Sequence, residues 1–527
     1  MSRPANILPT AAARFGDAAA LITDDTTLKY EDLNRLSDAV AAALISRGVV
    51  PGEVVSLYAQ NCWQWIVAYH GALKSGAVVN PVNVMLTADE LGYVLNNCGA
   101  TVLFVDSGLV EVARAAGVHA PSLRTIVSFS DDGTCQPDVV AFPALISEAN
   151  PLAAPVSRDC DSPAVIGYTS GTTGHPKGAV QSHRAVHLNI ALTAAMHGRT
   201  ERDVVVTALP AAHVYGNVAI NSTFMVGGTV VLMSRFNPTA ALRLIGHHHA
   251  TMFEGVPAMY AMMLADANID NARLASLTRC TVGGQTMPVP QIEQWQQLSG
   301  CRLIELWGMT EISGLGATHA LHTAPKPGSI GYSLPGMQFR VVNVDDSTQT
   351  VPVNESGELM VRGPLVMSGY HDNPEATSKA FDSDGWLHTG DIATQDEHGY
   401  LYLVDRLNDM IITGGYNIYP AEIERVLSGH PAIAHVAVGP VPDPVKGELA
   451  CAYVVPNTHS NLTEHDVIQF AAQRLAAYKR PRRVRFVATL PTTSTGKVMR
   501  RKLIDTPLSE TNHPASPATP RSTKENP

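Results

Sequence analysis

The chain has 527 residues, 45% of them hydrophobic, which is enough to build two or more packed cores. Its formal net charge of -10 gives no reason to expect nucleic acid or an anionic membrane as a partner. Seven cysteines without a C-x-x-C pair argue against a disulfide framework or a zinc site, and no apolar run approaches the ~18 residues of a membrane span. We therefore expect a cytoplasmic protein without a membrane span.

Strand-like runs alternate with helical patterns through most of the chain. The runs are residues 53–59, 100–106, 204–210 and 228–233. Between them, Thr87 precedes Glu90 by the spacing of a capping box, and Leu91 and Leu95 then fall on one helical face. The alternation predicts an α/β fold with a helix after Thr87.

The character of the sequence changes near residue 405. A hairpin-like stretch meets polar residues there, and a helix starts near Pro420, a residue that suits a first helical turn. We place an N-terminal domain over residues 1–404 and a small α+β C-terminal domain over residues 405–505. Residues 506–527 are rich in Pro, Ser and Thr and lack aromatic side chains, which predicts a disordered tail.

Residues 168–180, YTSGTTGHPKGAV, gather hydroxyl groups, glycines and one lysine without a hydrophobic period. This composition suits a polyphosphate, because each non-bridging oxygen needs a donor and the charge needs a cation. The P-loop pattern of nucleotide triphosphatases does not fit, since Lys177 is followed by Gly178 and not by Ser or Thr. The segment predicts a nucleotide-binding loop, with an ordinary surface loop as the alternative.

Six segments in this order resemble the adenylate-forming acyl-CoA synthetase family, and the resemblance covers about residues 25–505. They are TSGTTGHPKG (169–178), LPAAHVYG (209–216), LWGMTE (306–311), GWLHTGD (385–391), DRLNDMIITGGYNIYPAEIE (405–424) and PTTSTGKVMRRKL (491–503). The resemblance implies a large N-terminal domain of layered α/β subdomains, with a β-barrel-like part, and a small mobile α+β C-terminal domain. It also implies that ATP and Mg²⁺ convert an acid to an acyl-AMP, from which coenzyme A displaces AMP.

The same resemblance assigns roles to single residues. Those that would bind the nucleotide or coenzyme A are Thr169, Ser170, Gly171, Thr172, Thr173, Gly174, Lys177, Gly283, Gly284, Trp307, Gly308, Met309, Asp391, Arg406 and Gly415. Among them, Trp307 would stack on the adenine, and Asp391 and Arg406 would meet the ribose hydroxyls. The structural alternatives are core packing for Trp307 and a salt bridge for Asp391 with Arg406.

Four residues would carry the chemistry. Glu311 would ligate Mg²⁺, for which a carboxylate oxygen is a suitable ligand, although a solvated strand-end residue is the alternative. Thr310 would meet the α-phosphate, and His213 would stand at the entrance of the carboxylate pocket. Lys497 would reach the reacting carboxylate and the α-phosphate during adenylation only, because in this family the C-terminal domain rotates between the two half-reactions.

One position departs from the family pattern. The hinge of the rotation, usually Asp or Lys, is Asn408 here, which puts the charge interactions of the hinge in doubt. The histidines at 247–249 and the pair His183 and His187 have neither an H-E-x-x-H motif nor an acidic partner, and we interpret them as surface helix residues.

The segments expected to form the acyl pocket, 214–221, 252–263 and 308–318, are mainly apolar and lack an Arg or Lys that could pair a second carboxylate. They favour a monocarboxylic acid with an apolar tail: a medium- or long-chain fatty acid first, an aryl or cinnamate-type acid second. Transfer of the acyl group to a carrier-protein thiol or an amine is a further alternative, and so is a non-catalytic nucleotide-binding relative. The expected partners are therefore the acid, ATP and coenzyme A, without nucleic acid, and a homodimer stays open.

Overall fold

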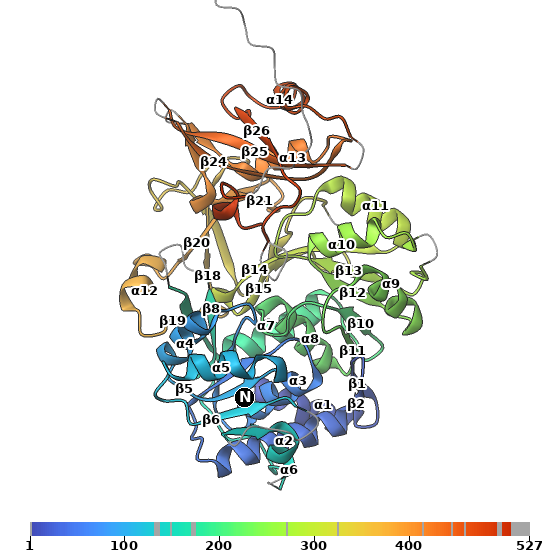
Figure 1. Cartoon of the computed structure of the whole chain (residues 1–527), viewed down its shortest axis with the longest axis vertical. Helices are drawn as coiled ribbons and strands as arrows, with labels where there is room; N and C mark the ends of the chain where they lie inside the picture. Colours follow the sequence, from blue (N-terminus) through green and yellow to red (C-terminus); the bar gives the residue numbers. More distant parts are fainter. Residues whose placement is uncertain are drawn as a thin grey trace, which may run out of the picture. The chain divides into compact units, whose positions relative to one another are not determined.

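The computed structural model describes residues 3–130, 138–147, 150–169, 175–269, 272–323, 326–413, 416–443, 446–457, 460–492 and 498–506 (Figure 1). The described residues form two compact units, and the chain passes from the first to the second between Val404 and Asp405. Each unit has its own hydrophobic core, so each is described separately.

An eight-stranded sheet forms one layer of the first unit. Its order is β19 (Gly369–Tyr370), β9 (Lys177–Ser182), β8 (Pro163–Thr169), β4 (Val78–Pro81), β3 (Val54–Tyr58), β5 (Ala100–Val105), β6 (Thr125–Ser128) and β7 (Val139–Ala141). The strands from β8 to β7 are parallel, whereas β8, β9 and β19 pair antiparallel. The antiparallel edge therefore carries both ends of the glycine-rich loop.

A nine-stranded sheet forms a second layer. Its order is β16 (Tyr332–Ser333), β15 (Gly314–Thr318), β14 (Arg302–Met309), β13 (Arg279–Val282), β12 (Met252–Gly255), β10 (Val204–Thr207), β11 (Thr229–Leu232), β1 (Ala19–Ile22) and β2 (Thr27–Lys29). The strands from β14 to β1 are parallel, so their carboxyl ends meet at one edge of the sheet, the usual place for a ligand in such folds.

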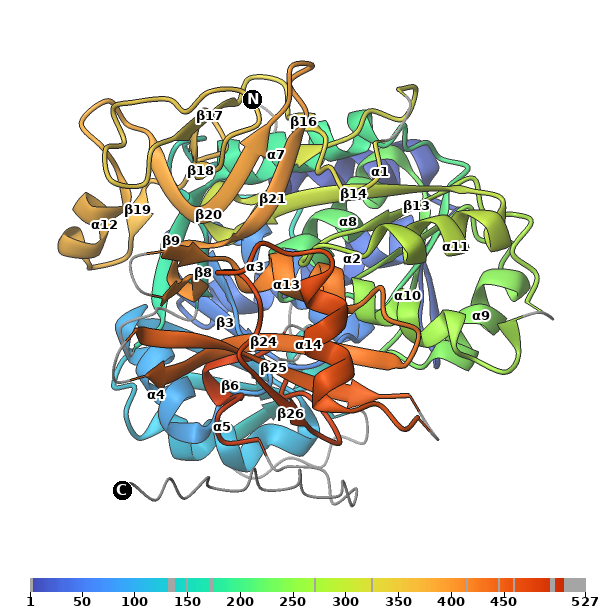
Figure 2. The same cartoon turned by 90° about the horizontal axis from the view of Figure 1, so that it is seen from above.

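Helices cover both sheets and fill the space between them. The helices are α1 (Ile7–Phe15), α2 (Tyr30–Ser46), α3 (Trp63–Lys74), α4 (Ala88–Asn97), α5 (Val110–Gly117), α6 (Phe142–Ser147), α7 (His183–Met196), α8 (Val214–Val226), α9 (Pro238–His247), α10 (Pro257–Leu264) and α11 (Val289–Ser299), with short 3₁₀ turns η1 (Pro4–Asn6), η2 (Ser107–Leu109) and η4 (Thr310–Ile312). One core joins α1, α2, α3 and α8 to strands of both sheets. The outer faces are covered by α4 and α5 on one side and by α9, α10 and α11 on the other (Figures 1 and 2). The first unit is thus layered α/β, as predicted.

The rest of the first unit is a four-stranded antiparallel sheet. Its order is β17 (Gln338–Val342), β18 (Gly357–Arg362), β20 (Leu387–Gln395) and β21 (Leu401–Arg406), whose last two residues belong to the second unit, and α12 (Pro374–Ala380) precedes β20. Its apolar side chains share a core with Trp307 and Leu315 of the nine-stranded sheet. This shared core brings Asp391 of β20 next to the end of β14.

The second unit is a small mixed sheet with two helices. The strands are β23 (Tyr416–Ile418), β22 (Ile411–Thr413), β25 (Gly447–Pro456) and β24 (Ile433–Asp443), with β26 (Arg483–Phe486) paired to β25. The helices are α13 (Pro420–Leu427) and α14 (Glu464–Ala472), and the short turns are η5 (Leu407–Asp409) and η6 (Arg500–Lys502). This is the α+β composition expected for the C-terminal part.

The local predictions made from sequence patterns are largely confirmed. The four strand-like runs contain β3, β5, β10 and β11, and α4 begins with the complete capping box of Thr87 and Glu90. The interpretation of His183 as a surface residue is wrong, because its side chain is buried at the start of α7, where burial lowers its pKa to about 4.

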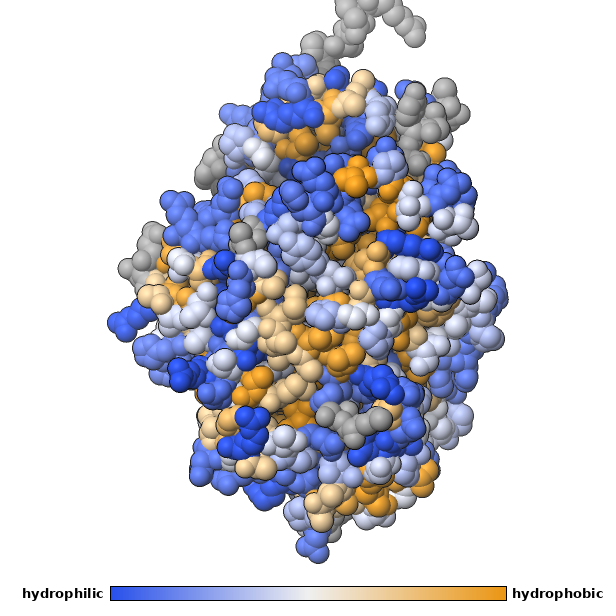
Figure 3. All heavy atoms as spheres, turned by 180° about the vertical axis from the view of Figure 1, so that it is seen from behind, coloured by the Kyte–Doolittle hydropathy of each residue, from blue (hydrophilic) through white to orange (hydrophobic). Residues whose placement is uncertain are grey.

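No helix within the described ranges is long and apolar enough to cross a membrane. Figure 3 shows hydrophilic residues spread among hydrophobic ones over the face that it draws.

Candidate active site

The glycine-rich loop connects β8 and β9, which pair antiparallel. Thr169 ends β8 and Lys177 begins β9, and the two are register partners across the pair. The predicted phosphate-binding residues Ser170, Gly171, Thr172, Thr173 and Gly174 lie outside the described residues. The Nζ of Lys177 lies 5.3 Å from the centre of the Tyr370 ring, a cation–π contact that fixes the ammonium group at the sheet edge.

Glu311 lies next to this lysine–tyrosine pair. Its side chain belongs to η4 and is only 7% exposed, so it is not the solvated strand-end residue of the alternative interpretation. The hydroxyl of Tyr370 donates a hydrogen bond to Glu311 Oε1 over 2.9 Å. Burial raises the pKa of Tyr370, so its hydroxyl keeps the proton that it donates. A buried carboxylate close to Lys177, the lysine predicted to bind phosphate, suits a hard cation such as Mg²⁺, which prefers oxygen ligands.

Side chains of α7 and β9 hold the turn that carries Thr310 and Glu311 in place. Ser313 adopts a left-handed φ of 61°, and Asn189 of α7 then donates to the carbonyls of Ile312 and Leu315 over 3.1 and 2.8 Å and accepts from the Leu315 N–H over 3.1 Å. The amide of Gln181 donates to the Thr310 carbonyl over 3.0 Å. These contacts hold Thr310 and Glu311 against β8 and β9, the strands that flank the loop.

The turn can lie this close to β8 because Gly167 has no side chain. A Cβ atom at this position would lie 2.6 Å from Thr310 Cγ2, so any larger residue would push the turn away from β8.

Trp307 and Asp391 meet through a direct hydrogen bond. The indole Nε1–H of Trp307 donates to Asp391 Oδ2 over 2.8 Å, and the Asp391 side chain is 6% exposed. The indole also packs edge-on against Phe339, with ring centres 5.6 Å apart. The structure therefore brings Trp307, predicted for the adenine, to Asp391, one of the two residues predicted for the ribose, and Trp307 also belongs to the apolar core.

The remaining predicted nucleotide residues of the first unit border this pair. Gly308 and Met309 follow Trp307 on β14, and a Cβ at Gly308 would lie 2.1 Å from the carbonyl oxygen of Gly314. Gly283 packs under Leu306, where a Cβ would come within 2.2 Å of Leu306 Cδ1. Gly284 has a left-handed φ of 85° and is exposed. The two glycines thus form a tight turn at the carboxyl end of β13.

His213 is the N-cap of α8. Its Nδ1 accepts the backbone N–H of Tyr215 over 3.3 Å, and the side chain is exposed at the start of the helix. The cap fixes the ring plane at the segment expected to line the acyl pocket.

In the second unit, Arg406 is exposed and directly follows Asp405, whose Oδ1 accepts the Arg406 N–H over 2.8 Å. Lys497 and Gly415 lie outside the described residues. The chain on the C-terminal side of Lys497 is anchored by Arg500, whose guanidinium donates to Asp409 and Glu424 over 2.7 and 2.8 Å and to Asp405 over 3.4 Å. Arg500 thereby ties this segment to the beginning of the second unit.

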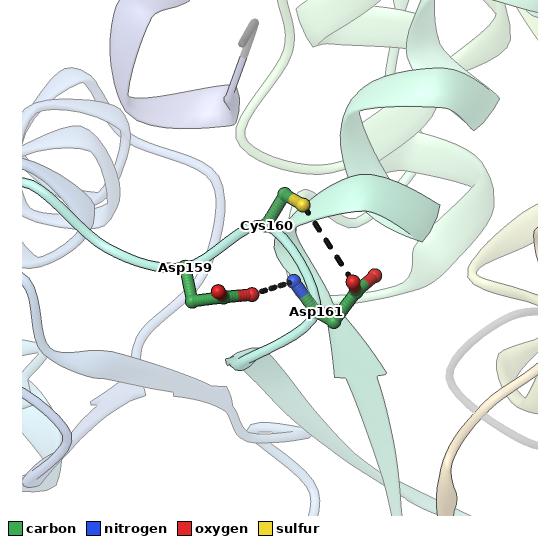
Figure 4. Close-up of side chains that lie close together, drawn as sticks. All are labelled: Asp159, Cys160 and Asp161. Carbon is green, nitrogen blue, oxygen red and sulfur yellow. Dashed lines mark hydrogen bonds between the residues drawn. The ribbon is translucent and has the colours of Figure 1, made fainter.

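Within the described part of the chain, one group of side chains has metal-ligand chemistry outside this region: Asp159, Cys160 and Asp161 (Figure 4). Arg184 already contacts it, donating to Asp161 Oδ1 over 2.7 Å and to Cys160 Sγ over 2.8 Å. A metal ion would have to displace this guanidinium, so the group does not change the choice of site.

Sequence reasoning missed Tyr370, Asn189 and Arg500. A polar asparagine on a helix otherwise rich in apolar residues, in HLNIAL, was a signal for Asn189. The arginine three residues after Lys497 was a signal for Arg500. Tyr370 carries no local signal, because its role comes from the pairing of β19 with β9.

Comparison with known proteins identifies the family of the chain. The AMP-binding enzyme family matches residues 8–371, and the AMP-binding enzyme C-terminal domain matches residues 422–497. The chain is 32% identical to a long-chain-fatty-acid–CoA ligase of Bacillus subtilis, over 95% of this chain and 94% of the relative. It is 36% identical to a 3-[(3aS,4S,7aS)-7a-methyl-1,5-dioxo-octahydro-1H-inden-4-yl]propanoyl:CoA ligase of Mycobacterium tuberculosis, over 92% and 95% of the two chains.

Among solved structures, an anthranilate CoA ligase in complex with anthranoyl-AMP superposes with a TM-score of 0.90 at 27% identity, covering 96% of this chain and 97% of the other. ATP, Mg²⁺ and coenzyme A are the cofactors and substrates of this family. The chain belongs to the AMP-binding enzyme family and is an AMP-forming acid–CoA ligase.

Proposed function

We propose that this ligase activates a monocarboxylic acid with an apolar body, and that coenzyme A is the acceptor of its acyl group. The observation that carries the proposal is the grouping of Lys177, Tyr370 and Glu311 beside the Trp307–Asp391 pair. A carboxylate and an α-phosphate repel each other, at a cost on the order of 4 kcal/mol for unit charges ~4 Å apart, so cations must gather where they meet.

In this proposal each residue of the first unit has one task. Lys177 holds phosphate oxygens, Glu311 holds Mg²⁺ with Tyr370 orienting its carboxylate, and Thr310 meets the α-phosphate. Asp391, which Trp307 orients, accepts hydrogen bonds from the ribose hydroxyls. Lys497 is proposed to act on the carboxylate and the α-phosphate during adenylation, and Arg406 to meet the ribose hydroxyls.

The apolar body of the acid is proposed from the walls of the expected pocket. Tyr215, Ala219 and Val256 belong to the same apolar cluster as Trp307, and Met259 packs against it. The buried cation Arg199 is paired with Glu254 over 2.5 Å, so it is not available to the second carboxylate of a diacid.

Two kinds of acid compete for this pocket. The sequence favoured an alkyl chain, and a long-chain ligase is among the relatives. A ring acid of limited length is favoured by Tyr215, because a hydrogen bond of 2.7 Å to Thr281 fixes its ring as a rigid wall.

The test is an acid panel with ATP, Mg²⁺ and coenzyme A, in which AMP, pyrophosphate and thioester are measured. At least one alkyl or ring monocarboxylic acid should give all three products. Absence of acid-dependent pyrophosphate release across the panel would overturn the proposal. If pyrophosphate appears but free coenzyme A does not accelerate AMP release, a carrier-protein thiol or an amine is the acceptor instead.

A further inference from the structure

Four polar side chains form a buried chain of hydrogen bonds at the carboxyl ends of adjacent parallel strands. Glu254 of β12 and Thr281 of β13 are register partners, so their side chains lie in one row on one face of the sheet. Tyr215 shares a hydrogen bond of 2.7 Å with Thr281, and Thr281 donates to Glu254 Oε1 over 3.0 Å. Arg199 donates to the same carboxylate oxygen over 2.5 Å. We name these four residues the Glu254 cluster.

The second oxygen of Glu254 accepts no hydrogen bond within the described part of the chain. The side chains of Arg199 and Glu254 are both 0% exposed, and Glu254 Oε2 has no hydrogen-bond partner among the described residues. Burying a carboxylate oxygen without a hydrogen-bond donor costs folding free energy, because the oxygen loses its bonds to water. Such groups are rare in folded proteins. A ligand that donates a hydrogen bond to Oε2 would remove that cost.

The position of the Glu254 cluster connects it to the acid. Thr281 precedes Gly283 by two residues, and Gly283 opens the turn expected to border adenine and the acyl group. Tyr215 follows His213, the expected entrance of the carboxylate pocket, by two residues. Tyr215 also shares an apolar core with Val256 and Trp307, so the cluster lies beside the segments expected to form the acyl pocket.

We propose that the Glu254 cluster is the specificity-determining end wall of the acyl pocket and selects a compact acid that carries a hydroxyl group at its far end. The inference rests on the proposed function, since it names the substrate class of the same site. The hydroxyl donates to Glu254 Oε2. Arg199 neutralises the carboxylate, so the cluster accepts a neutral donor and not a cationic group.

The cluster also explains what is rejected. A long alkyl tail would have to pass a buried ion pair or lie against an unsatisfied oxygen. A site built to hydrogen-bond a substrate hydroxyl discriminates strongly against the analogue that lacks it.

The experiment compares matched acids that differ by one hydroxyl group: 3-(4-hydroxyphenyl)propanoate with 3-phenylpropanoate, and 8-hydroxyoctanoate with octanoate. The quantity measured is the ratio of kcat/KM for the hydroxylated acid to that for the plain acid. This ratio is taken within one protein preparation, so a smaller folded fraction does not change it. In the native enzyme we expect a ratio of about 10 or more in at least one pair.

The variant R199M/E254M removes the ion pair and keeps the volume apolar, a replacement that buried ion pairs often tolerate. Its ratio should fall to about 1 in the pair that showed the preference, since no acceptor remains. If this variant does not fold, R199Q/E254Q removes the charges and keeps polar groups, and the ratio should then fall at least about threefold, because hydrogen bonds to charged groups are the stronger ones.

The matched control is the buried pair of Arg279 and Asp203, 2.8 Å apart, in which Arg279 stands at the amino end of β13. The variant R279M/D203N should keep the native ratio. The inference is overturned if the native enzyme uses the plain acid as well as the hydroxylated one in both pairs, or if the preference survives in the variants of Arg199 and Glu254. Failure of every acid to release pyrophosphate would instead overturn the proposed function itself.

Discussion

We assign Mg²⁺ binding to the carboxylate of Glu311. Replacing one of its oxygens with an amide group tests this assignment. Glu311→Gln keeps the shape of the side chain and the hydrogen bond from Tyr370 but removes the negative charge. We expect acyl-AMP formation to fall about 100-fold or more, the usual loss for one electrostatic contact to a developing charge. The measurement is pyrophosphate release as Mg²⁺ is titrated. Tyr370→Phe is the matched control: it removes the hydrogen bond and keeps the charge, so its loss should be nearer tenfold. Equal activity of Glu311→Gln and the native enzyme would contradict the assignment.

Trp307 holds the carboxylate that we assign to the ribose. Trp307→Phe keeps an aromatic ring for the adenine and deletes the donor to Asp391. A hydrogen bond to a charged group is worth about 1.5–3 kcal/mol, so KM for ATP should rise about tenfold or more while the acid KM changes little. Trp386→Phe, a tryptophan that lies between Arg340 and Arg362, is the control and should leave both constants unchanged. A parallel rise of both KM values would point to general damage of the site.

Glu305, two residues before Trp307, makes stability depend on pH. Burial raises the pKa of its carboxyl from 4.5 to about 8, against the lowering effect of the hydrogen bond from the Gly328 N–H. Between these two values the folded protein holds a proton that the unfolded chain releases, so stability falls as pH rises from 4.5 to 8. Thermal unfolding at pH 6 and pH 8 should show a fall in Tm that is smaller in Glu305→Gln. The same fall in both proteins would assign the effect to another group.

The turn after β14 shows how a helix can serve chemistry that it does not touch. Asn189 of α7 makes three hydrogen bonds to the backbone of residues 312–315. Asn189→Ala should cost about 2–4 kcal/mol in stability, because buried backbone groups lose their partners, and should weaken the Mg²⁺ dependence of acyl-AMP formation about tenfold by releasing the turn. The matched control is Ser222→Ala on α8, a buried residue whose side-chain hydroxyl donates to the Ala219 carbonyl, and this change should affect stability alone. If the Mg²⁺ titration of Asn189→Ala is unaltered, the turn keeps its conformation without the hydrogen bonds from Asn189.

The elements of this fold differ in how far the sequence could reveal them. The capping box of α4 lies within four residues, and the valine-rich strands can be recognised from their own residues, so both were predicted. The contact of Tyr370 with Glu311 spans 59 residues and that of Asn189 with Leu315 spans 126, and neither leaves a periodic trace. His183 was misjudged because α7 packs between other elements, so a helix position that pattern alone would expose is covered. The family motifs could indicate which residues gather, but not which of them hold one another in place.

The chain divides into two units between Val404 and Asp405, and the two expected half-reactions can be assayed separately. Lys497 is proposed to act in adenylation only, so Lys497→Ala should suppress acyl-AMP formation by about 100-fold or more while thioester formation from supplied acyl-AMP changes less than about threefold. Pyrophosphate release and thioester formation, assayed separately on the same preparation, measure the two halves. Equal losses in both halves would remove the special role of this lysine.

Asn408 allows the complementary experiment, because it lies in the short turn η5 just after the boundary between the units. Asn408→Pro fixes φ near -65° and restricts the residue before it, so a rotation that needs new backbone angles there becomes costly. We expect acyl-AMP formation to stay within about threefold of the native rate and thioester formation to fall at least about tenfold. Asn408→Ala, which leaves the backbone free to turn, is the matched control and should keep both halves. Together with Lys497→Ala this gives opposite losses in the two half-reactions, which a rigid enzyme with one fixed arrangement of its units would not produce.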